Sequence, residues 1–139
     1  MDSHARRFSA NHAEFDAIAA YIESACTGTS EEERLRIMLL VEELFANSVN
    51  HGYGGDSDKP VWLTVRVGDE ILELVYEDCA PAYNPFEEVD ASSTEDDVEH
   101  RRIGGLGIVL LIELSSSRSY ERRGDRNVIE LHVPRGGAG

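Results

Sequence analysis

The stretch LLVEELFANSVNHGYG, from Leu39 to Gly54, combines a long apolar run with three polar side chains at helical spacing. At about 100° per residue, Asn47 lies about 40° from Glu43 on a helix, and Asn50 lies about 20° to its other side. A narrow polar stripe thus follows a helix that is otherwise apolar, which predicts burial on several sides. Buried carboxylates and amides cost free energy unless they are hydrogen-bonded. The stripe is therefore either satisfied by neighbouring backbone or forms the floor of a binding site.

Length and composition predict one globular domain. The chain has 139 residues, of which 41% are hydrophobic and 29% are charged, as is ordinary for a soluble protein. It has neither an apolar segment of membrane-spanning length nor a secretory apolar core after its first residues, so we expect a cytoplasmic protein without a membrane contact. Cys26 and Cys79 lack metal-ligand spacing and are expected to be reduced thiols.

The net charge of the chain limits the kinds of partner that it is expected to bind. A formal net charge of −14 argues against DNA or RNA, because neutralising phosphates requires a basic surface. A basic protein surface or a metal–nucleotide complex is compatible with this charge.

Helix start signals come early in the chain, after a short edge strand predicted over residues 5–9. The two signals are Asn11 with Glu14 and Ser30 with Glu33. The first predicted helix ends at Gly28, and the second runs to about His51.

Two hairpins are predicted in the rest of the chain. Residues 61–67 and 71–76 are joined by Gly68-Asp69, where a glycine at the first turn position favours a type II′ turn. Residues 117–122 and 128–133 turn at Gly124-Asp125, and a short apolar helix is predicted within residues 103–114. The order strand, two helices, two strands, helix, two strands predicts a mixed, mainly antiparallel sheet with helices on one face, an α+β two-layer sandwich.

A long acidic segment separates the third strand from the last helix. Residues 80–102 contain two prolines and seven acidic residues without a periodic apolar pattern. A structureless loop of this length is uncommon in a compact domain and is often a lid when it occurs. The segment is interpreted either as a solvated acidic loop or as a lid.

Two further signals are weak on their own. Glycines at 104, 105 and 107 precede an apolar helix, where backbone N–H groups can approach an anion, although a tight turn would leave the same pattern. Asp78 follows an apolar strand and is either a strand-ending turn residue or an acceptor for an amino group on a planar ring.

The order of these signals resembles a known superfamily. Glu43-x-x-x-Asn47 with His51-Gly52-Tyr53, then Asp78-x-Ala80, then Gly104-Gly105-Leu106-Gly107-Ile108 is similar to the three nucleotide boxes of the gyrase, Hsp90, histidine kinase and MutL ATPases. The phrases NHGYGG, PAYNPFE and GGLGI resemble the bacterial anti-sigma factor serine kinases. The resemblance spans roughly residues 8–134 and implies a Bergerat-type ATP-binding fold, one domain over residues 1–139, and ATP with Mg²⁺ as ligands.

The resemblance also implies roles for residues. Asn47 would coordinate Mg²⁺, Glu43 would act as the general base, and Asp78 would accept the adenine amino group. Gly104, Gly105 and Gly107, with Leu106 and Ile108 in the same segment, would wrap the phosphates. The segment of about 80–103 would be the ATP lid.

Four further positions are candidate nucleotide-binding residues. His51 would approach the phosphates, and Arg102, or its neighbour Arg101, would stabilise charge on the γ-phosphate. The chain departs from the family at two of the candidate positions. Ala80 stands where the family usually has glycine, and Asn50 stands where related histidine kinases have a basic residue.

Three functions follow as hypotheses. The first is an anti-sigma factor that phosphorylates an anti-sigma factor antagonist of the STAS type and holds a sigma factor, as a homodimer. The second is a non-catalytic module whose affinity for a regulatory partner is gated by nucleotide. The third is an interaction domain that has lost nucleotide binding.

Overall fold

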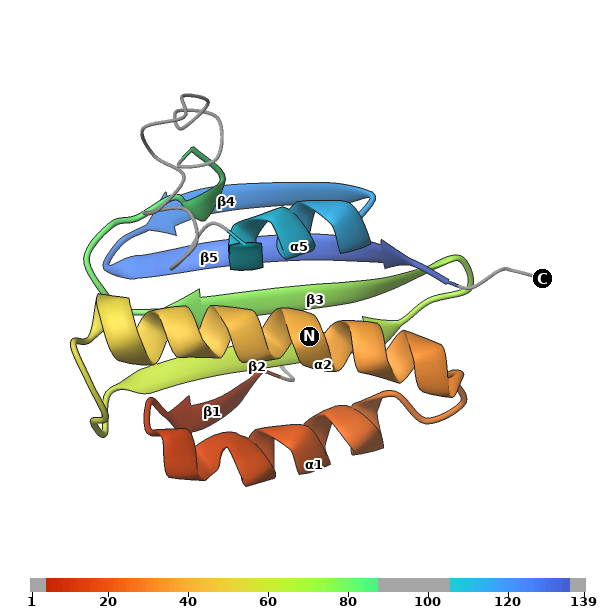
Figure 1. Ribbon diagram of the computed structural model, residues 1–139, viewed down its shortest axis with the longest axis horizontal. Coiled ribbons are helices and arrows are strands. Elements are labelled where there is room, and N and C mark those ends of the chain that lie inside the picture. Colours follow the sequence, from red (N-terminus) through yellow and green to blue (C-terminus); the bar gives the residue numbers. More distant parts are fainter. Residues whose placement is uncertain (1–4, 88–105, 136–139) are drawn as a thin grey trace.

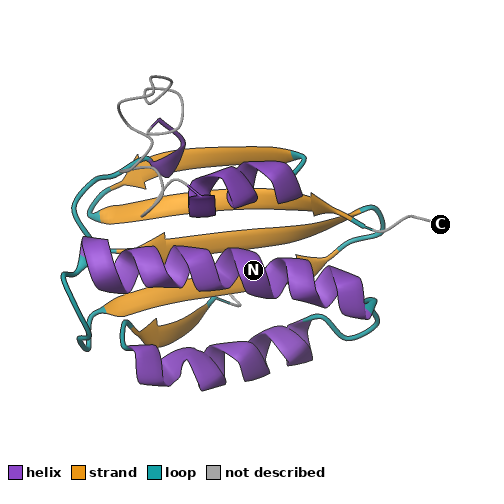
Figure 2. Cartoon of the chain, viewed as in Figure 1, coloured by secondary structure: helices purple, strands orange, loops and turns teal. Residues whose placement is uncertain are grey.

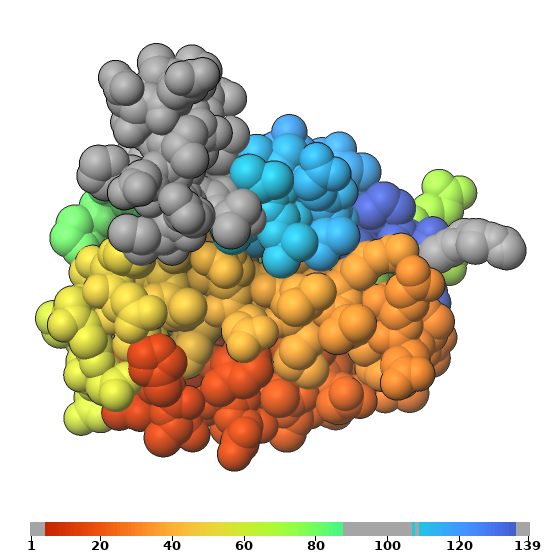
Figure 3. Space-filling model, viewed as in Figure 1, coloured from red at the N-terminus to blue at the C-terminus, as the bar shows by residue number. Residues whose placement is uncertain are grey.

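The computed structural model describes residues 5–87 and 106–135. Five strands form one sheet in the order β1-β2-β3-β5-β4. The strands are β1 (Arg6–Ser9), β2 (Pro60–Val67), β3 (Ile71–Asp78), β4 (Ser117–Arg123) and β5 (Arg126–Pro134). Helices α1 (Phe15–Ala25), α2 (Glu31–Asn47) and α5 (Leu106–Leu114) lie side by side over one face of this sheet (Figures 1 and 2). Figure 3 shows this helix-covered face, with α1 in red and orange, α2 in orange and yellow, and α5 in cyan.

The two-layer arrangement and the mainly antiparallel sheet are confirmed. The parallel pairing that a mixed sheet would contain is not found among the described strands, which all pair antiparallel. The topology explains the difference. The crossover through α5 makes β4 parallel to β3, but β5 then turns back and inserts between them. The two parallel strands are therefore not neighbours, and each hydrogen-bonded pair is antiparallel.

Both predicted helix start signals cap a helix, but they form different hydrogen bonds. Ser30 and Glu33 form the predicted capping box: Glu33 N–H donates to Ser30 Oγ at 3.0 Å, and Ser30 N–H donates to Glu33 Oε1 at 2.9 Å. Asn11 instead caps a short 3₁₀ helix, η1 (His12–Glu14), that leads into α1. Glu14 accepts a hydrogen bond from Ser9 N–H, so it ties the helix start to β1 rather than completing a capping box.

The type II′ turn predicted at Gly68-Asp69 is wrong. Gly68 does not have a positive φ, and its N–H donates to Ile71 O at 2.9 Å across the β2–β3 turn. At the β4–β5 turn, Gly124 has a φ of 64° and Asp125 does not have a positive φ, as a type II′ turn requires. The Gly-Asp pairs look alike in sequence, but only the second joins strands through two residues.

The core lies between the helices and the covered face of the sheet. Along β3, Leu72, Leu74 and Tyr76 are buried while the alternate residues are partly exposed, which is the period of a sheet with one packed face. Val41, Leu44 and other apolar residues of α2 fill the space above them, so the predicted burial of this helix is confirmed. Among the described residues, no helix is long and apolar enough to cross a membrane.

Candidate nucleotide site

A pocket of about 540 Å³ opens beside the C-terminal end of α2, on the helix-covered face of the sheet. Its walls come from α2, from the turn that follows it, from the end of β3 with the next loop, and from the start of β5. The lining residues are Leu44, Asn47, Ser48, His51, Gly52, Tyr76, Asp78, Ala80, Pro81, Ala82, Tyr83, Pro85, Asn127 and Ile129. The pocket therefore brings together four of the predicted site residues: Asn47, His51, Asp78 and Ala80.

The polar stripe of α2 divides where the helix changes its winding. After Asn47 the chain continues as one turn of π-helix, η2 (Ser48–Gly52), so the regular α-helical spacing ends there. Asn47 is half-buried and lines the pocket, and the exposed His51 stands at its edge. Asn50 is exposed and is not among the described lining residues, so a nucleotide contact for it stays a prediction.

Glu43 is half-buried one helical turn before Asn47 and contacts the first turn of α5. A Cβ built on Gly107 would lie 1.9 Å from the Glu43 carboxylate, so only a glycine leaves room for the carboxylate in this position. Burial raises the pKa of Glu43, the neighbouring Glu42 carboxylate raises it further, and His51 opposes the shift. A carboxyl with a raised pKa binds a proton more readily than an exposed glutamate does.

The inward phase of β3 directs Asp78 into the pocket. It continues the series of Leu72, Leu74 and Tyr76, and it is only 8% exposed. Asp78 Oδ2 accepts a hydrogen bond from Ser48 Oγ at 2.6 Å, and Ser48 Oγ accepts one from Tyr76 OH at 2.8 Å. Burial raises the pKa of Tyr76 well above its ordinary value, which keeps this phenol a donor.

Asn127 satisfies the other carboxylate oxygen of Asp78, and sequence reasoning missed it. Its Nδ2 donates to Asp78 Oδ1 at 2.9 Å, and the N–H of Ala80 donates to the same oxygen at 3.2 Å. A signal was present, since Asn127 lies in phase with the inward residues Ile129 and Leu131 of β5. A polar residue in an inward position of a buried strand requires a partner.

The methyl group of Ala80 packs toward the turn after α2. Ala80 is 3% exposed, and a Cβ built on Gly52 would lie 2.8 Å from Ala80 Cβ. The absence of a side chain at Gly52 therefore leaves the space that the methyl of Ala80 needs. This accommodates the departure from the family's glycine at position 80.

Tyr53 connects two segments that flank the pocket. Its hydroxyl donates to Pro60 O at 2.7 Å and accepts from Cys79 N–H at 2.7 Å. Burial is the main cause that raises the pKa of Tyr53 to about 12. The tyrosine of the sequence phrase NHGYGG thus fixes the backbone directly after Asp78.

Part of the predicted site lies outside the described residues. Arg101, Arg102, Gly104 and Gly105 belong to this part, as does the predicted lid beyond residue 87. Leu106 and Ile108 are described by their backbone only, in the first turn of α5.

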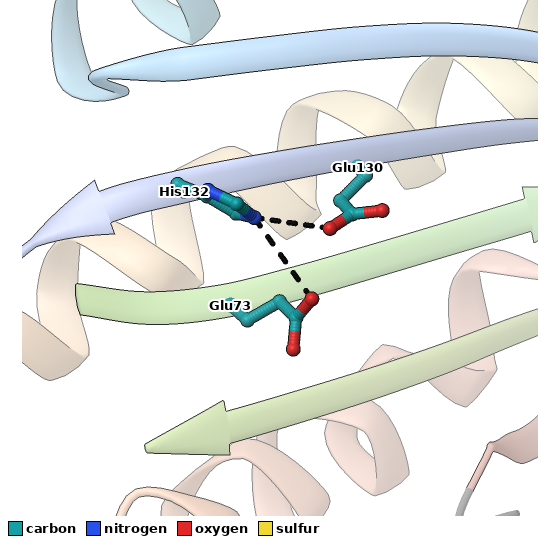
Figure 4. Close-up of side chains that lie close together, drawn as sticks. All are labelled: Glu73, Glu130 and His132. Atoms are coloured by element: carbon teal, nitrogen blue, oxygen red, sulfur yellow. Dashed lines mark hydrogen bonds and ion pairs between the residues drawn. The ribbon is translucent and has the colours of Figure 1, made fainter. Parts of the chain in front are cut away.

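A second cluster of titratable side chains lies away from the pocket. Figure 4 shows Glu73 of β3 and Glu130 and His132 of β5 pointing toward one another, with ligand atoms within 4.8 Å. His132 Nε2 is 3.0 Å from Glu130 Oε2, and Arg66 donates to Glu73 at 2.9 Å. Because Glu73 alternates with the inward residues of β3, this group lies on the opposite face of the sheet and is not part of the pocket.

Comparisons with known proteins agree with this geometry. Residues 8–133 match the model of a family described as the histidine kinase-like ATPase domain. The chain therefore belongs to this family, for which ATP is the implied ligand.

The individual proteins that the chain resembles share little sequence identity with it. Serine-protein kinase RsbW of Listeria innocua serovar 6a is 28% identical over 87 residues, which cover 60% of this chain and 55% of that protein. The match therefore spans little more than half the length of this relative. Among solved structures, histidine kinase AdeS of Acinetobacter baumannii superposes with a TM-score of 0.50 over 99% of this chain and 70% of that chain. At 14% identity, this likeness shows the fold alone.

Proposed function

We propose that this chain binds ATP with Mg²⁺ and transfers the γ-phosphoryl group to a serine of a partner protein. The proposal rests mainly on Asp78, a buried carboxylate in the wall of the pocket. Asn47 lines the same pocket, and Glu43 precedes Asn47 by one helical turn. Family membership supports the nucleotide, and the name of the RsbW relative supports serine phosphorylation.

The pocket fits a nucleotide base. Its volume of about 540 Å³ lies within the range of small-molecule sites. Leu44, Ala80 and Ile129 offer apolar surface for the faces of a ring. A carboxylate has about four acceptor positions, of which Ser48, Asn127 and Ala80 take three on Asp78. The position that is left suits one N–H of an amino group.

The side chains of α2 suit metal binding and proton transfer. The amide oxygen of Asn47 is a ligand type that Mg²⁺ prefers, and it lies at the pocket wall. Bound Mg-ATP would supply the phosphoryl group and neutralise charge on it. Glu43 would accept the proton of the attacking serine hydroxyl. Its raised pKa is favourable for this role, because a general base works best when its pKa lies near the working pH.

The proposed partners follow from the resemblance of the sequence to the anti-sigma factor serine kinases. The substrate would be an anti-sigma factor antagonist of the STAS type, and a sigma factor would be held by surface contact. Residues 1–139 would form one domain that acts as a homodimer. The net charge of −14 is compatible with basic surfaces on these partners.

One observation favours the non-catalytic alternative, a module in which nucleotide sets the affinity for a regulatory partner. The carboxylate of Glu43 packs against Gly107, and Glu43 is not among the described lining residues of the pocket. In this arrangement the general base does not face the pocket.

Phosphorylation with labelled ATP, Mg²⁺ and the cognate antagonist separates these functions. We expect phosphoserine on the antagonist and a loss of about 100-fold or more in Glu43→Gln. Glu31→Gln is the matched control, because Glu31 is an exposed glutamate in the same helix, far from Glu43, and should retain the rate. ATP binding by calorimetry without phosphate transfer would support the non-catalytic module. No ATP binding at all would refute both functions.

A further inference from the structure

The side-chain amide of Asn127 joins β5 to the end of β3 and to the loop that follows β3, more than forty residues earlier in the chain. Asn127 is 5% exposed. Its Nδ2 lies 2.9 Å from Asp78 Oδ1, 3.1 Å from Ala80 O and 3.1 Å from Pro81 O. One side-chain nitrogen therefore holds the carboxylate and the loop that follows it.

The other end of the amide receives donors. Asn127 Oδ1 accepts from Tyr120 OH at 2.6 Å, from Tyr83 N–H at 3.2 Å and from Arg122 Nη1 at 3.2 Å. Because acceptors surround the nitrogen and donors surround the oxygen, a flipped amide would oppose like groups on both sides. The network thus fixes the direction in which the amide points at Asp78.

This direction decides how much of Asp78 is left for a ligand. Asn127 and the N–H of Ala80 take both acceptor positions of Oδ1. Ser48 takes one position of Oδ2, and among residues 5–87 and 106–135 it is the donor to this oxygen, so within these residues one position of Oδ2 remains. A position that accepts a hydrogen bond distinguishes an amino group from a carbonyl oxygen or a bare ring carbon.

We propose that Asn127 is a positioning residue for base recognition, which orients Asp78 so that its remaining acceptor position selects a purine amino group. This inference rests on the proposed nucleotide function. The same amide fixes the backbone of Ala80, Pro81 and Tyr83, which line the pocket beside the carboxylate. Selectivity for the base and the shape of this wall therefore depend on one side chain.

The test compares ATP with purine riboside triphosphate, which lacks only the amino group. Calorimetry of the full chain with Mg²⁺ should show ATP binding about ten- to a hundredfold more tightly, since the lost hydrogen bond leaves a buried charged acceptor unmatched. In Asn127→Ala this ratio should fall toward one, because Asp78 is no longer oriented. A merely structural role would weaken both nucleotides and preserve the ratio, which would overturn the inference.

Two more variants complete the experiment. Tyr120→Phe removes one donor to Asn127 Oδ1 but leaves the contact with Asp78, so it should retain the wild-type ratio. If Asn127→Ala does not fold, Asn127→Leu fills a similar space without a donor to Asp78, and a ratio equal to that of the wild type would contradict the proposal. A wild-type chain that binds ATP without preferring it also overturns the inference while leaving the proposed function in place. A wild-type chain that binds neither nucleotide refutes the proposed function itself.

Discussion

Exchanging the residues of the Gly52–Ala80 contact should show that the two positions share one methyl-sized space. In Gly52→Ala, the new Cβ would lie 2.8 Å from Ala80 Cβ, whereas carbon atoms pack best at about 3.5–4.0 Å. The turn must therefore move by about 1 Å, and overpacking of this kind costs about 1–3 kcal/mol. Gly52 does not have a positive φ, so the backbone itself accepts alanine.

The reverse substitution should also destabilise the protein. Ala80→Gly removes a buried methyl group, which is worth about 0.8 kcal/mol. It also gives the unfolded chain more conformational freedom, at a cost of about 0.4–1 kcal/mol. The double variant Gly52→Ala with Ala80→Gly places the methyl on the opposite side of the same contact. We expect its stability to lie within about 1 kcal/mol of the wild type, because the substitutions are in direct contact and compensate.

Urea unfolding of the four proteins, followed by circular dichroism, measures this coupling. Calorimetry with Mg-ATP on the same samples shows whether the exchanged methyl restores the pocket. If the losses of the two single variants add up in the double variant, the reasoning is refuted. Additivity would mean that methyl groups at positions 52 and 80 do not compete for the same space. Ala80→Gly alone should weaken ATP binding only to the extent that the loss of the methyl group makes this wall of the pocket less well packed.

Three further predictions concern other residues of the site. Glu43→Gln should raise stability at about pH 7 and leave it nearly unchanged at about pH 4, because a raised native pKa makes stability fall as pH rises from the ordinary value through the native one; equal urea midpoint shifts at both pH values would contradict this. Ser48→Ala should cost about 1–3 kcal/mol in urea unfolding, because the buried hydroxyl of Tyr76 loses its acceptor, and adding Tyr76→Phe should recover part of the loss. Asn47→Ala should weaken Mg-ATP binding at least about tenfold in calorimetry with little change in the unfolding midpoint, and an unchanged affinity would remove Asn47 from the proposed metal site.

Much of the fold was predictable because local signals dominate it. The capping box at Ser30 and the burial of the helix that follows it each depend on residues a few positions apart, and both were confirmed. The pairing of β5 with β3 and not with a parallel neighbour was not predictable, because the place of a strand in a sheet depends on long-range contacts. The winding of η2 was not predictable for the same reason, since tertiary packing can override the regular helical repeat.

The candidate site shows the same division. Glu43, Asn47 and Asp78 could be identified from the sequence because each is a polar residue in an apolar segment. Ser48 and Asn127 were missed, although they hold the two oxygens of Asp78. The inward phase of Asn127 indicates that it needs a partner, but a partner forty-nine positions away cannot be identified from local pattern, and the same holds for Ser48 at thirty positions.

The amino-acid sequence alone indicates that a polar stripe lies on a mostly buried helix and must be matched by partners. Burial of apolar faces and the cost of unpaired polar groups are properties of residue types at given spacings, so they can be read along the chain. The surroundings of the three side chains become visible only in the folded chain: Asn47 lines the pocket, Glu43 contacts Gly107, and Asn50 is exposed. The physical reason is that direction, unlike burial, depends on what the rest of the chain packs against each side of the helix.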